Sequence, residues 1–250
     1  MSNNLLVRVD KLIFEGETRP LIEGLTMMVA AGSVASIMGP TGAGKTTLMK
    51  VIAGLEKRFD GSISLGGIEV TRPSRKIQVI FQDYRLLPWK TVEGNLRFAA
   101  PDRMRKEEVE INIANRLTEL QLIGIAKRWP SGLSGGERAG VAFARAFMDP
   151  PEVLLADEPF SGMDLLRKYE LEHNLTQAAM SRNTTLIVVS HSVEDAVFLS
   201  DTVFIFQKDP FRVVKVFNIE KPRSTRDHLD LALLEKQREV TECLLRASRT

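Results

Sequence analysis

Residues 39–46 have the sequence Gly39-Pro40-Thr41-Gly42-Ala43-Gly44-Lys45-Thr46, which matches the pattern G-x-x-x-x-G-K-[ST]. An apolar segment at 33–38 precedes it and a helical pattern over 46–54 follows, which is the context that a phosphate-binding loop requires. Glycines let backbone N–H groups surround phosphate oxygens, and the helix N-terminus adds partial positive charge. The sequence therefore predicts a nucleoside triphosphate site, in preference to a glycine-rich turn that binds nothing.

A second apolar segment, at 153–156, ends in the acidic residues Asp157 and Glu158. Acidic side chains at the carboxyl end of a parallel strand face the ligand crevice of an α/β sheet. One carboxylate can hold the water shell of a metal ion, and the other can position and deprotonate an attacking water. Considered alone, this pattern also suits an ordinary strand that enters a polar turn. The nearby phosphate-binding loop favours the functional interpretation.

The stretch Leu133-Ser134-Gly135-Gly136-Glu137 introduces a strong helical pattern over 137–148. Ser134 and Glu137 have the S-x-x-E spacing of a capping box, which is a purely structural explanation of the motif. The two glycines also expose backbone donors at a helix N-terminus, which favours anion binding. The motif is thus either a helix cap alone or a second anion site.

Two isolated polar residues follow apolar segments. Gln82 comes after 77–81 and His191 after 188–190, so both lie at strand ends that can face the same crevice as the loop. Each alone has an ordinary alternative, a surface glutamine or a loop histidine. Together with the loop they become candidates for contact with the nucleotide and its metal ion.

The composition is that of an ordinary globular protein of 250 residues, with 34 basic and 32 acidic side chains and 44% hydrophobic residues. This balance excludes a disordered tail or a protein that coats nucleic acid. The single cysteine, Cys243, has no partner for a disulfide. No apolar run approaches the roughly 20 residues that span a bilayer, and the first ten residues show no export signal, so we expect a cytoplasmic location.

Hydrophobic periodicity predicts an α/β fold. A helical insert is expected between Pro88 and Leu133, because the strand signal disappears there. The last helix is expected over 227–247, with Leu229, Leu233, Val240 and Leu244 on one apolar stripe. Further strands are expected at 5–14, 24–29, 62–65, 186–189 and 203–206, and a further helix at 107–122.

Taken in order, the loop, Gln82, the Leu-Ser-Gly-Gly-Glu stretch, Asp157-Glu158, Ser161-Gly-Met-Asp164 and His191 resemble the ATP-binding cassette (ABC) ATPases. The resemblance implies one ABC ATPase domain over 1–250. It implies a P-loop NTPase core with a mixed and largely parallel sheet at 1–87 and 150–226, including an N-terminal antiparallel β subdomain. An inserted helical subdomain would occupy 88–149, and a C-terminal helix 227–250.

The same resemblance implies a head-to-tail dimer with two ATP molecules at its interface, each held by one chain's loop and by Ser134–Glu137 of the other chain. Glu158 would be the general base, His191 would contact the γ-phosphate, and Lys45 and Gln82 would complete the catalytic set. Thr46, Gln82 and Asp157 would hold Mg²⁺. The residues expected to bind ATP are Phe14, which would stack on adenine, and Gly39, Pro40, Thr41, Gly42, Ala43, Gly44, Lys45, Thr46, Thr47, Ser134, Gly135, Gly136 and Glu137.

Within that family, the stretch Phe81-Gln82-Asp83-Tyr84-Arg85-Leu86-Leu87-Pro88-Trp89-Lys90-Thr91-Val92 looks like the nitrate, sulfonate and taurine importers. This implies an integral membrane permease as partner, an extracytoplasmic solute-binding protein that acts indirectly, and a peripheral position on the cytoplasmic face of the membrane. We expect Tyr84 and Arg85 to be exposed contacts for the permease, whereas Trp89 either docks there or packs the helical insert onto the core.

The chain departs from the usual family pattern at four places: Glu137, Ala139-Gly140, Gly162-Met163 and Ser192. None of them removes a phosphate ligand or the base. Gly140 is the most unusual, because glycine within a helix costs about 1 kcal/mol relative to alanine.

The sequence therefore favours the ATPase subunit of an importer for a small anionic solute. The alternatives are the ATPase of another transporter class, an ABC ATPase that acts on nucleic acid or ribosomes, and a small-molecule kinase. We expect no nucleic-acid partner, because such relatives usually carry two cassettes or a long coiled coil. Ser134–Glu137 and His191 argue against a kinase.

The loop assignment predicts that Lys45→Ala abolishes Mg²⁺-dependent ATP hydrolysis. Lys45 is the only cationic side chain within 39–46, so its loss weakens binding of the β- and γ-phosphates. A steady-state assay of phosphate release measures the effect. Undiminished turnover in the variant would contradict the assignment.

Overall fold

A six-stranded sheet forms the centre of the computed structural model, which describes residues 3–13, 19–208 and 211–248. Its strand order is β10-β9-β3-β8-β7-β6; β6, β7, β8, β3 and β9 run parallel, and β10 pairs antiparallel with β9. The strands are β3 (Val34–Met38), β6 (Ile77–Ile80), β7 (Val153–Asp157), β8 (Thr185–Val189), β9 (Thr202–Gln207) and β10 (Arg212–Asn218).

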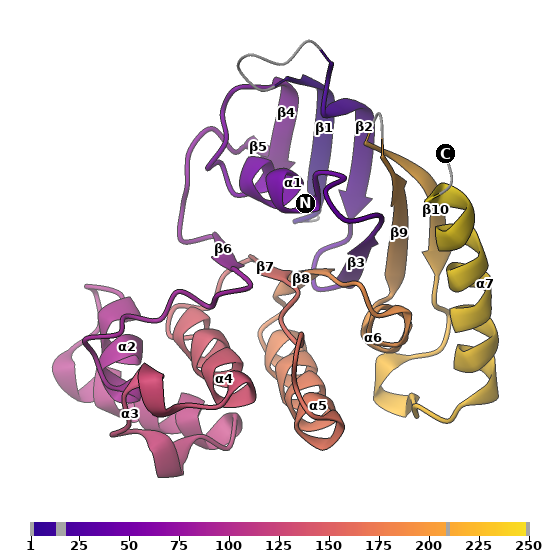
Figure 1. The fold of residues 1–250 in the computed structure, drawn as a ribbon. Coiled ribbons are helices and arrows are strands. Elements are labelled where there is room, and N and C mark those ends of the chain that lie inside the picture. Colours follow the sequence, from indigo (N-terminus) through magenta and orange to yellow (C-terminus); the bar gives the residue numbers. More distant parts are fainter. Residues whose placement is uncertain (1–2, 14–18, 209–210, 249–250) are drawn as a thin grey trace.

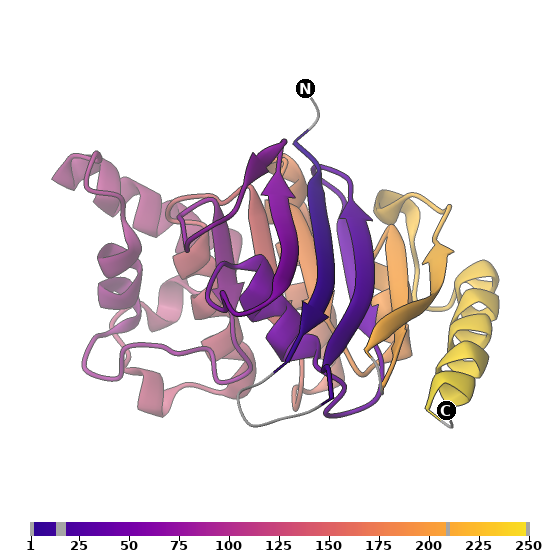
Figure 2. The ribbon, with the colours of Figure 1, turned by 90° about the horizontal axis from the view of Figure 1, so that it is seen from above.

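A smaller antiparallel sheet packs over one face of this central sheet (Figures 1 and 2). Its order is β2-β1-β4-β5, with β1 at Leu5–Leu12, β2 at Ile22–Val29, β4 at Asp60–Leu65 and β5 at Ile68–Glu69. In β1, Leu5, Val7 and Val9 are fully buried and the residues between them are exposed. This alternation is typical of a sheet with one face in the core and one in solvent.

Helices occupy both sides of the central sheet. The helix α1 (Lys45–Ile52) packs within the core beneath the small sheet, and α4 (Gly135–Ala146), α5 (Leu165–Ser181) and α6 (Val193–Leu199) lie on the opposite side (Figure 1). The expected helical insert contains α2 (Val92–Ala99), α3 (Lys106–Glu119) and two short 3₁₀ helices, η1 (Ile123–Ile125) and η2 (Pro130–Gly132). After η3 (Arg223–Thr225), α7 (Leu231–Ala247) packs against β9 and α6.

The central strands are buried on both faces, as their continuous apolar runs predict. In β7, Val153 and Leu155 contact the core shared with α1 and the small sheet, whereas Leu154 and Ala156 contact the core beneath α4 and α5. All four side chains are fully buried. Sheet and helices therefore fix the carboxyl ends of these strands firmly.

The expected strands and helices are present, and their bounds differ by a few residues at several ends. The strands β5 and β10 were not expected. The last helix begins at Leu231 rather than 227, because Asp230 caps it through a bond accepted from the Ala232 N–H. Leu229 therefore lies outside the apolar stripe and is 84% exposed, and the expectation for it is wrong. Phe14 lies outside the described residues.

Packing explains the unusual glycine in α4. A Cβ atom at Gly140 would lie only 3.2 Å from Cδ1 of Leu122, the buried residue just before η1. A larger side chain would push the two segments apart. The cost of glycine in this helix is thus offset by the close approach of α4 to the end of the helical insert.

The segment between β10 and α7 is anchored to α5 and α6. Arg226 donates hydrogen bonds to the carbonyl oxygens of Val197, Phe198 and Ser200, which lie at the C-terminal end of α6. Burial lowers the pKa of Arg226 to about 10, so it keeps its charge at neutral pH. His228 stacks between the rings of Tyr169 and Phe198, at centroid distances of 3.7 and 3.6 Å.

Within the described ranges, none of the helices combines the length and the apolar character that crossing a lipid bilayer demands.

Glu172 of α5 is a buried carboxyl beside this anchor. It has no exposed surface, and both of its side-chain oxygens lack a hydrogen-bond partner in the described part of the chain. Burial, reinforced by the negative charge of Asp195, raises the pKa of Glu172 to about 8. At neutral pH the folded protein therefore holds this carboxyl largely protonated.

We predict that Glu172→Gln flattens the pH dependence of stability. The folded pKa of Glu172 lies above its unfolded value, so wild-type stability decreases as the pH rises from about 5 to about 8, with a slope of at most about 1.4 kcal/mol per pH unit from this group. Glutamine does not titrate, so the stability of the variant should rise relative to that of wild type as the pH increases over that range. Urea unfolding at pH 5, 6.5 and 8 measures this. A constant difference between the two proteins would contradict the prediction.

Candidate active site

The phosphate-binding loop connects the end of β3 to the start of α1, at the carboxyl edge of the central sheet. Gly44 caps α1 with a φ of 116°, a left-handed conformation that favours glycine. At Gly39 a Cβ atom would lie 2.8 Å from the carbonyl oxygen of Phe206, so β9 leaves no room for a side chain there. Gly42 has a φ of 72°, so left-handed backbone accounts for Gly42 and Gly44 and close packing accounts for Gly39.

Lys45 lies inside the loop and is almost fully buried. Its Nζ donates hydrogen bonds of 2.8 Å to the carbonyl oxygens of Gly39 and Pro40. Burial lowers the pKa of Lys45, while the negative charges of Glu158 and Asp157 oppose that shift. The ammonium group is therefore held within the loop, next to two carboxylates.

The two acidic residues at the end of β7, Asp157 within the strand and Glu158 directly after it, point to different partners, as expected. Asp157 accepts a hydrogen bond of 2.7 Å from the hydroxyl of Thr46. Because β7 and β3 both pair with β8, this bond joins the end of β7 to the start of α1, which follows β3 on the other side of β8. Thr46 and Asp157 together present oxygen atoms at one point of the sheet edge.

Glu158 adopts an unusual backbone conformation, with a φ of 48°. Its N–H donates to the carbonyl oxygen of Val189, the last residue of β8. This left-handed turn directs its carboxylate away from Asp157 and toward Gln82 and His191. Nε2 of Gln82 donates to Oε2 of Glu158 over 3.3 Å, and Nε2 of His191 lies 2.7 Å from Oε1. Such conformations in residues other than glycine cluster at functional sites.

A cavity of about 300 Å³ connects these groups. It brings half of the predicted site residues together, and Gln82 joins them through its bond to Glu158. Gly39, Pro40 and Ala43 of the loop do not line it: Gly39 and Pro40 accept the hydrogen bonds of Lys45, and the Ala43 side chain packs fully buried in the core. The cavity is lined by Leu21, Thr41, Gly42, Gly44, Lys45, Thr46, Thr47, Asp157, Glu158 and His191.

The residues Ser134–Glu137 do not line this cavity. They form the capping box at the start of α4: Ser134 N–H donates to the Glu137 carboxylate over 2.7 Å, and Glu137 N–H donates to Ser134 Oγ over 3.2 Å. The capping box is thus confirmed. Glu137, one of the departures from the family pattern, is a member of this cap.

Two features of the site region were not predicted. Leu21 lines the cavity and contacts the Gly44 position, yet an apolar residue before a strand gives no sequence signal for such a role. Lys168 of α5 pairs with Asp195 of α6 beside His191, over 2.7 Å. The S-x-x-D spacing from Ser192 to Asp195 was a signal for the α6 cap, but nothing in the sequence indicated Lys168.

Chemically, the arrangement combines a cation and backbone donors for phosphate with oxygen ligands for a hard metal ion and a carboxylate beside a histidine. These are the components of phosphoryl transfer to water. The hydroxyl of Thr46 and the carboxylate of Asp157 are the donor types that Mg²⁺ prefers.

Comparison with known proteins supports this chemistry. The model of the family described as ABC transporter matches residues 22–161. The aliphatic sulfonates import ATP-binding protein SsuB 2 of Burkholderia lata is 37% identical over 211 residues, covering 84% of this chain and 76% of the relative. The aliphatic sulfonates import ATP-binding protein SsuB of Bacillus subtilis is 34% identical over 219 residues, covering 88% and 85%.

Solved structures show the same fold. The dimeric structure of a post-hydrolysis state of the ATP-binding cassette MJ0796, bound to ADP and Pi, superposes with a TM-score of 0.76 at 25% identity, covering 88% of this chain and 100% of that one. The structure of cbiO1 from Clostridium perfringens, part of an ABC transporter complex, has a TM-score of 0.79 at 23% identity, covering 97% and 96%.

Proposed function

This chain belongs to the ABC transporter family and is an ATPase, and from that premise we propose that it powers an importer of small anionic solutes of the sulfonate, nitrate or taurine type. The observation that carries the proposal is the convergence of Lys45, the Thr46–Asp157 pair and the Glu158–His191 pair on one cavity. The curated relatives named for aliphatic sulfonate import support the solute class.

Within this proposal, the loop 39–46 and Thr47 bind the phosphates of ATP, and Lys45 neutralises the β- and γ-phosphates. Thr46 and Asp157 hold Mg²⁺, with Gln82 as a further oxygen ligand, because hydroxyl, carboxylate and amide oxygens suit a hard divalent cation. When bound, Mg²⁺ neutralises negative charge that develops on the phosphates. Phe14 is proposed to stack on adenine.

Glu158 is the proposed general base. Its Oε1 takes the proton of the attacking water, and its bond with Gln82 fixes the orientation of the carboxylate. His191 Nε2 lies 2.7 Å from Oε1 in this structure, and its single N–H would donate to the γ-phosphate instead when ATP is bound. Without nucleotide, Gln82 and His191 thus both orient the Glu158 carboxylate.

A second copy of the chain completes the site in this proposal. Ser134–Glu137 lie at the start of α4, away from the cavity of their own chain, where they can serve the ATP of a partner. The dimeric state of the cassette MJ0796 supports this arrangement.

The proposed membrane partner is a permease, which receives solute from an extracytoplasmic binding protein. Trp89 lies between β6 and α2 and is 68% exposed, so it does not serve mainly to pack the helical insert. Arg85 is also exposed and stacks on Phe81. The expectation that Tyr84 is exposed is wrong: its ring is buried and its hydroxyl donates to the carbonyl oxygen of Pro159.

The proposed organisation is a single ABC ATPase domain. Its core spans 1–87 and 150–226, its helical subdomain spans 88–149, and its C-terminal helix lies within 227–250. The protein would be held at the cytoplasmic face of the membrane by the permease.

We predict that Glu158→Gln keeps ATP binding but slows hydrolysis roughly 10²–10⁴-fold, because the amide cannot accept the proton of water. The ATP-bound dimer should therefore accumulate, as measured by light scattering with ATP and Mg²⁺. Glu110→Gln, which removes an exposed carboxylate on α3, is the matched control and should behave like wild type. Normal turnover of Glu158→Gln would exclude Glu158 as the general base. A variant that stays monomeric at high concentration with ATP would exclude the two-site dimer.

We also predict that Trp89→Ala leaves ATP hydrolysis by the isolated protein within about twofold of wild type, while transport by the assembled system decreases at least about tenfold. Loss of one large aromatic contact at an interface typically costs 2 kcal/mol or more, or roughly a thirtyfold weaker association. Trp129→Ala is the control, since Trp129 is also exposed, at 52%. Co-purification with the permease and solute uptake are the measurements. Equal uptake by wild type and Trp89→Ala would place the docking surface elsewhere.

A further inference from the structure

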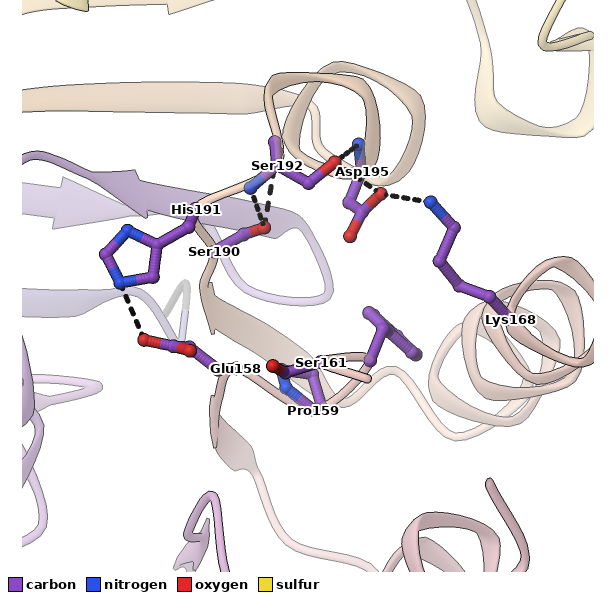
Figure 3. A pocket seen from close by; sticks show the side chains of 9 residues that line it. Glu158, Pro159, Ser161, Lys168, Ser190, His191, Ser192 and Asp195 are labelled. Carbon is purple, nitrogen blue, oxygen red and sulfur yellow. Dashed lines mark hydrogen bonds and ion pairs between the residues drawn. The ribbon is translucent and has the colours of Figure 1, made fainter. Parts of the chain in front are cut away.

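A second cavity, of about 230 Å³, adjoins the phosphate cavity, and Figure 3 shows the residues that line the second cavity. Glu158 and His191 line both cavities and so form the wall between them. On the other side of the second cavity are Lys168 of α5 and Asp195 of α6. Neither of these charged residues has a part in the chemistry described above.

A continuous set of hydrogen bonds connects these residues to the two neighbours of His191. Ser192 N–H donates to Ser190 Oγ over 3.0 Å, and Ser192 Oγ donates to Asp195 Oδ1 over 2.7 Å. Asp195 N–H in turn donates to Ser192 Oγ, which caps α6. Lys168 Nζ donates to the same Oδ1 over 2.7 Å (Figure 3). The turn that carries His191 is therefore tied through Asp195 to α5.

The Lys168–Asp195 pair is shielded from water. The exposed fractions are 13% for the Lys168 side chain and 8% for that of Asp195. Burial disfavours the charge on Lys168, but the hydrogen bond to Asp195 and the negative charges of Asp195 and Glu194 outweigh it and raise the pKa. The lysine is thus charged at neutral pH, and water screens its contact with Asp195 far less than an exposed pair.

Lys168 also lies near the start of α5, which Asp164 caps by accepting a hydrogen bond from the Arg167 N–H. The chain leads to this cap from Glu158 through 159–163. Lys168 therefore connects the segment that follows Glu158 with the turn that carries His191. The Lys168–Asp195 ion pair reaches the histidine turn through the hydroxyl of Ser192.

We propose that Lys168 is a positioning residue for His191: through Asp195 and Ser192 it holds the turn after β8 so that His191 Nε2 meets Glu158 and the reacting phosphate. This inference rests on the proposed role of His191. It differs from a purely structural role, in which the pair only joins α5 to α6 and its loss lowers stability without acting through the histidine.

The test compares Lys168→Met, which removes the charge, with Lys168→Arg, which keeps it. Lys168→Met should lower kcat for ATP roughly 10- to 100-fold, since a displacement of about 1 Å at a reacting group can cost 10²-fold. KM for ATP should stay within about twofold, because the phosphate-binding loop is untouched. Lys168→Arg should restore most of kcat. Lys236→Met, which removes an ion pair on α7, is the control and should match wild type.

A double-mutant cycle separates positioning from general stabilisation. If Lys168 acts only through His191, then Lys168→Met in a His191→Ala background should cost nothing further, so the double variant should hydrolyse ATP at the rate of His191→Ala. Multiplicative losses would overturn the inference, as would an unchanged kcat in Lys168→Met. Wild-type kcat in His191→Ala would instead overturn the proposed role of the histidine.

A second variant covers the case in which Lys168→Met does not fold, as judged by circular dichroism. Ser192→Ala removes the hydroxyl through which Asp195 contacts the histidine turn, while leaving the buried ion pair intact. It should lower kcat without changing KM for ATP, and its effect should also vanish in the His191→Ala background. A wild-type kcat in folded Ser192→Ala, or a loss that persists in that background, would overturn the inference.

Discussion

The parallel pairing of β3, β8 and β7 is the constraint on which the site depends. Parallel strands end at the same edge of a sheet, so the residues that follow them meet even though they lie far apart in the sequence. The loop that leads to Thr46 follows β3, Asp157 and Glu158 lie at the end of β7, and His191 follows β8. Thr46 contacts Asp157 over 2.7 Å, and His191 contacts Glu158 over 2.7 Å. Because the strands are buried on both faces, their ends cannot shift without disturbing two cores.

Local sequence rules were sufficient to predict most of this arrangement. Apolar runs that end in polar residues identified the strand ends, and the loop pattern identified the phosphate site. Sequence alone could not predict whether Tyr84 is buried or exposed, because a tyrosine suits a core and an interface equally well. It also could not predict the Lys168–Asp195 pair, because these residues lie 27 positions apart in the sequence and only tertiary packing brings their two helices together. The prediction for Leu229 was wrong for a local reason: Asp230 caps α7, so the helix begins after Leu229.

Glu158 is where local preference and function conflict. A φ of 48° is unfavourable for a residue that carries a Cβ atom, and a glycine would adopt it freely. A glycine, however, would supply no carboxylate at this point. Two sets of contacts stabilise this conformation. The Glu158 N–H donates to the Val189 carbonyl oxygen, and the carboxylate contacts Gln82 and His191. The surrounding sheet thus imposes a conformation that the residue would not choose by itself.

The anchoring of the C-terminal segment has a consequence for how the protein loses activity. Arg226 satisfies three carbonyls at one end of α6, and the turn that carries His191 lies at the other end of the same short helix. With only seven residues, α6 has little intrinsic stability and depends on tertiary contacts. Local opening of the segment around Arg226 and His228 would therefore free α6 and the histidine turn together, while the phosphate-binding loop after β3 stays folded. Partial unfolding from this end would yield a protein that still holds nucleotide but no longer turns it over.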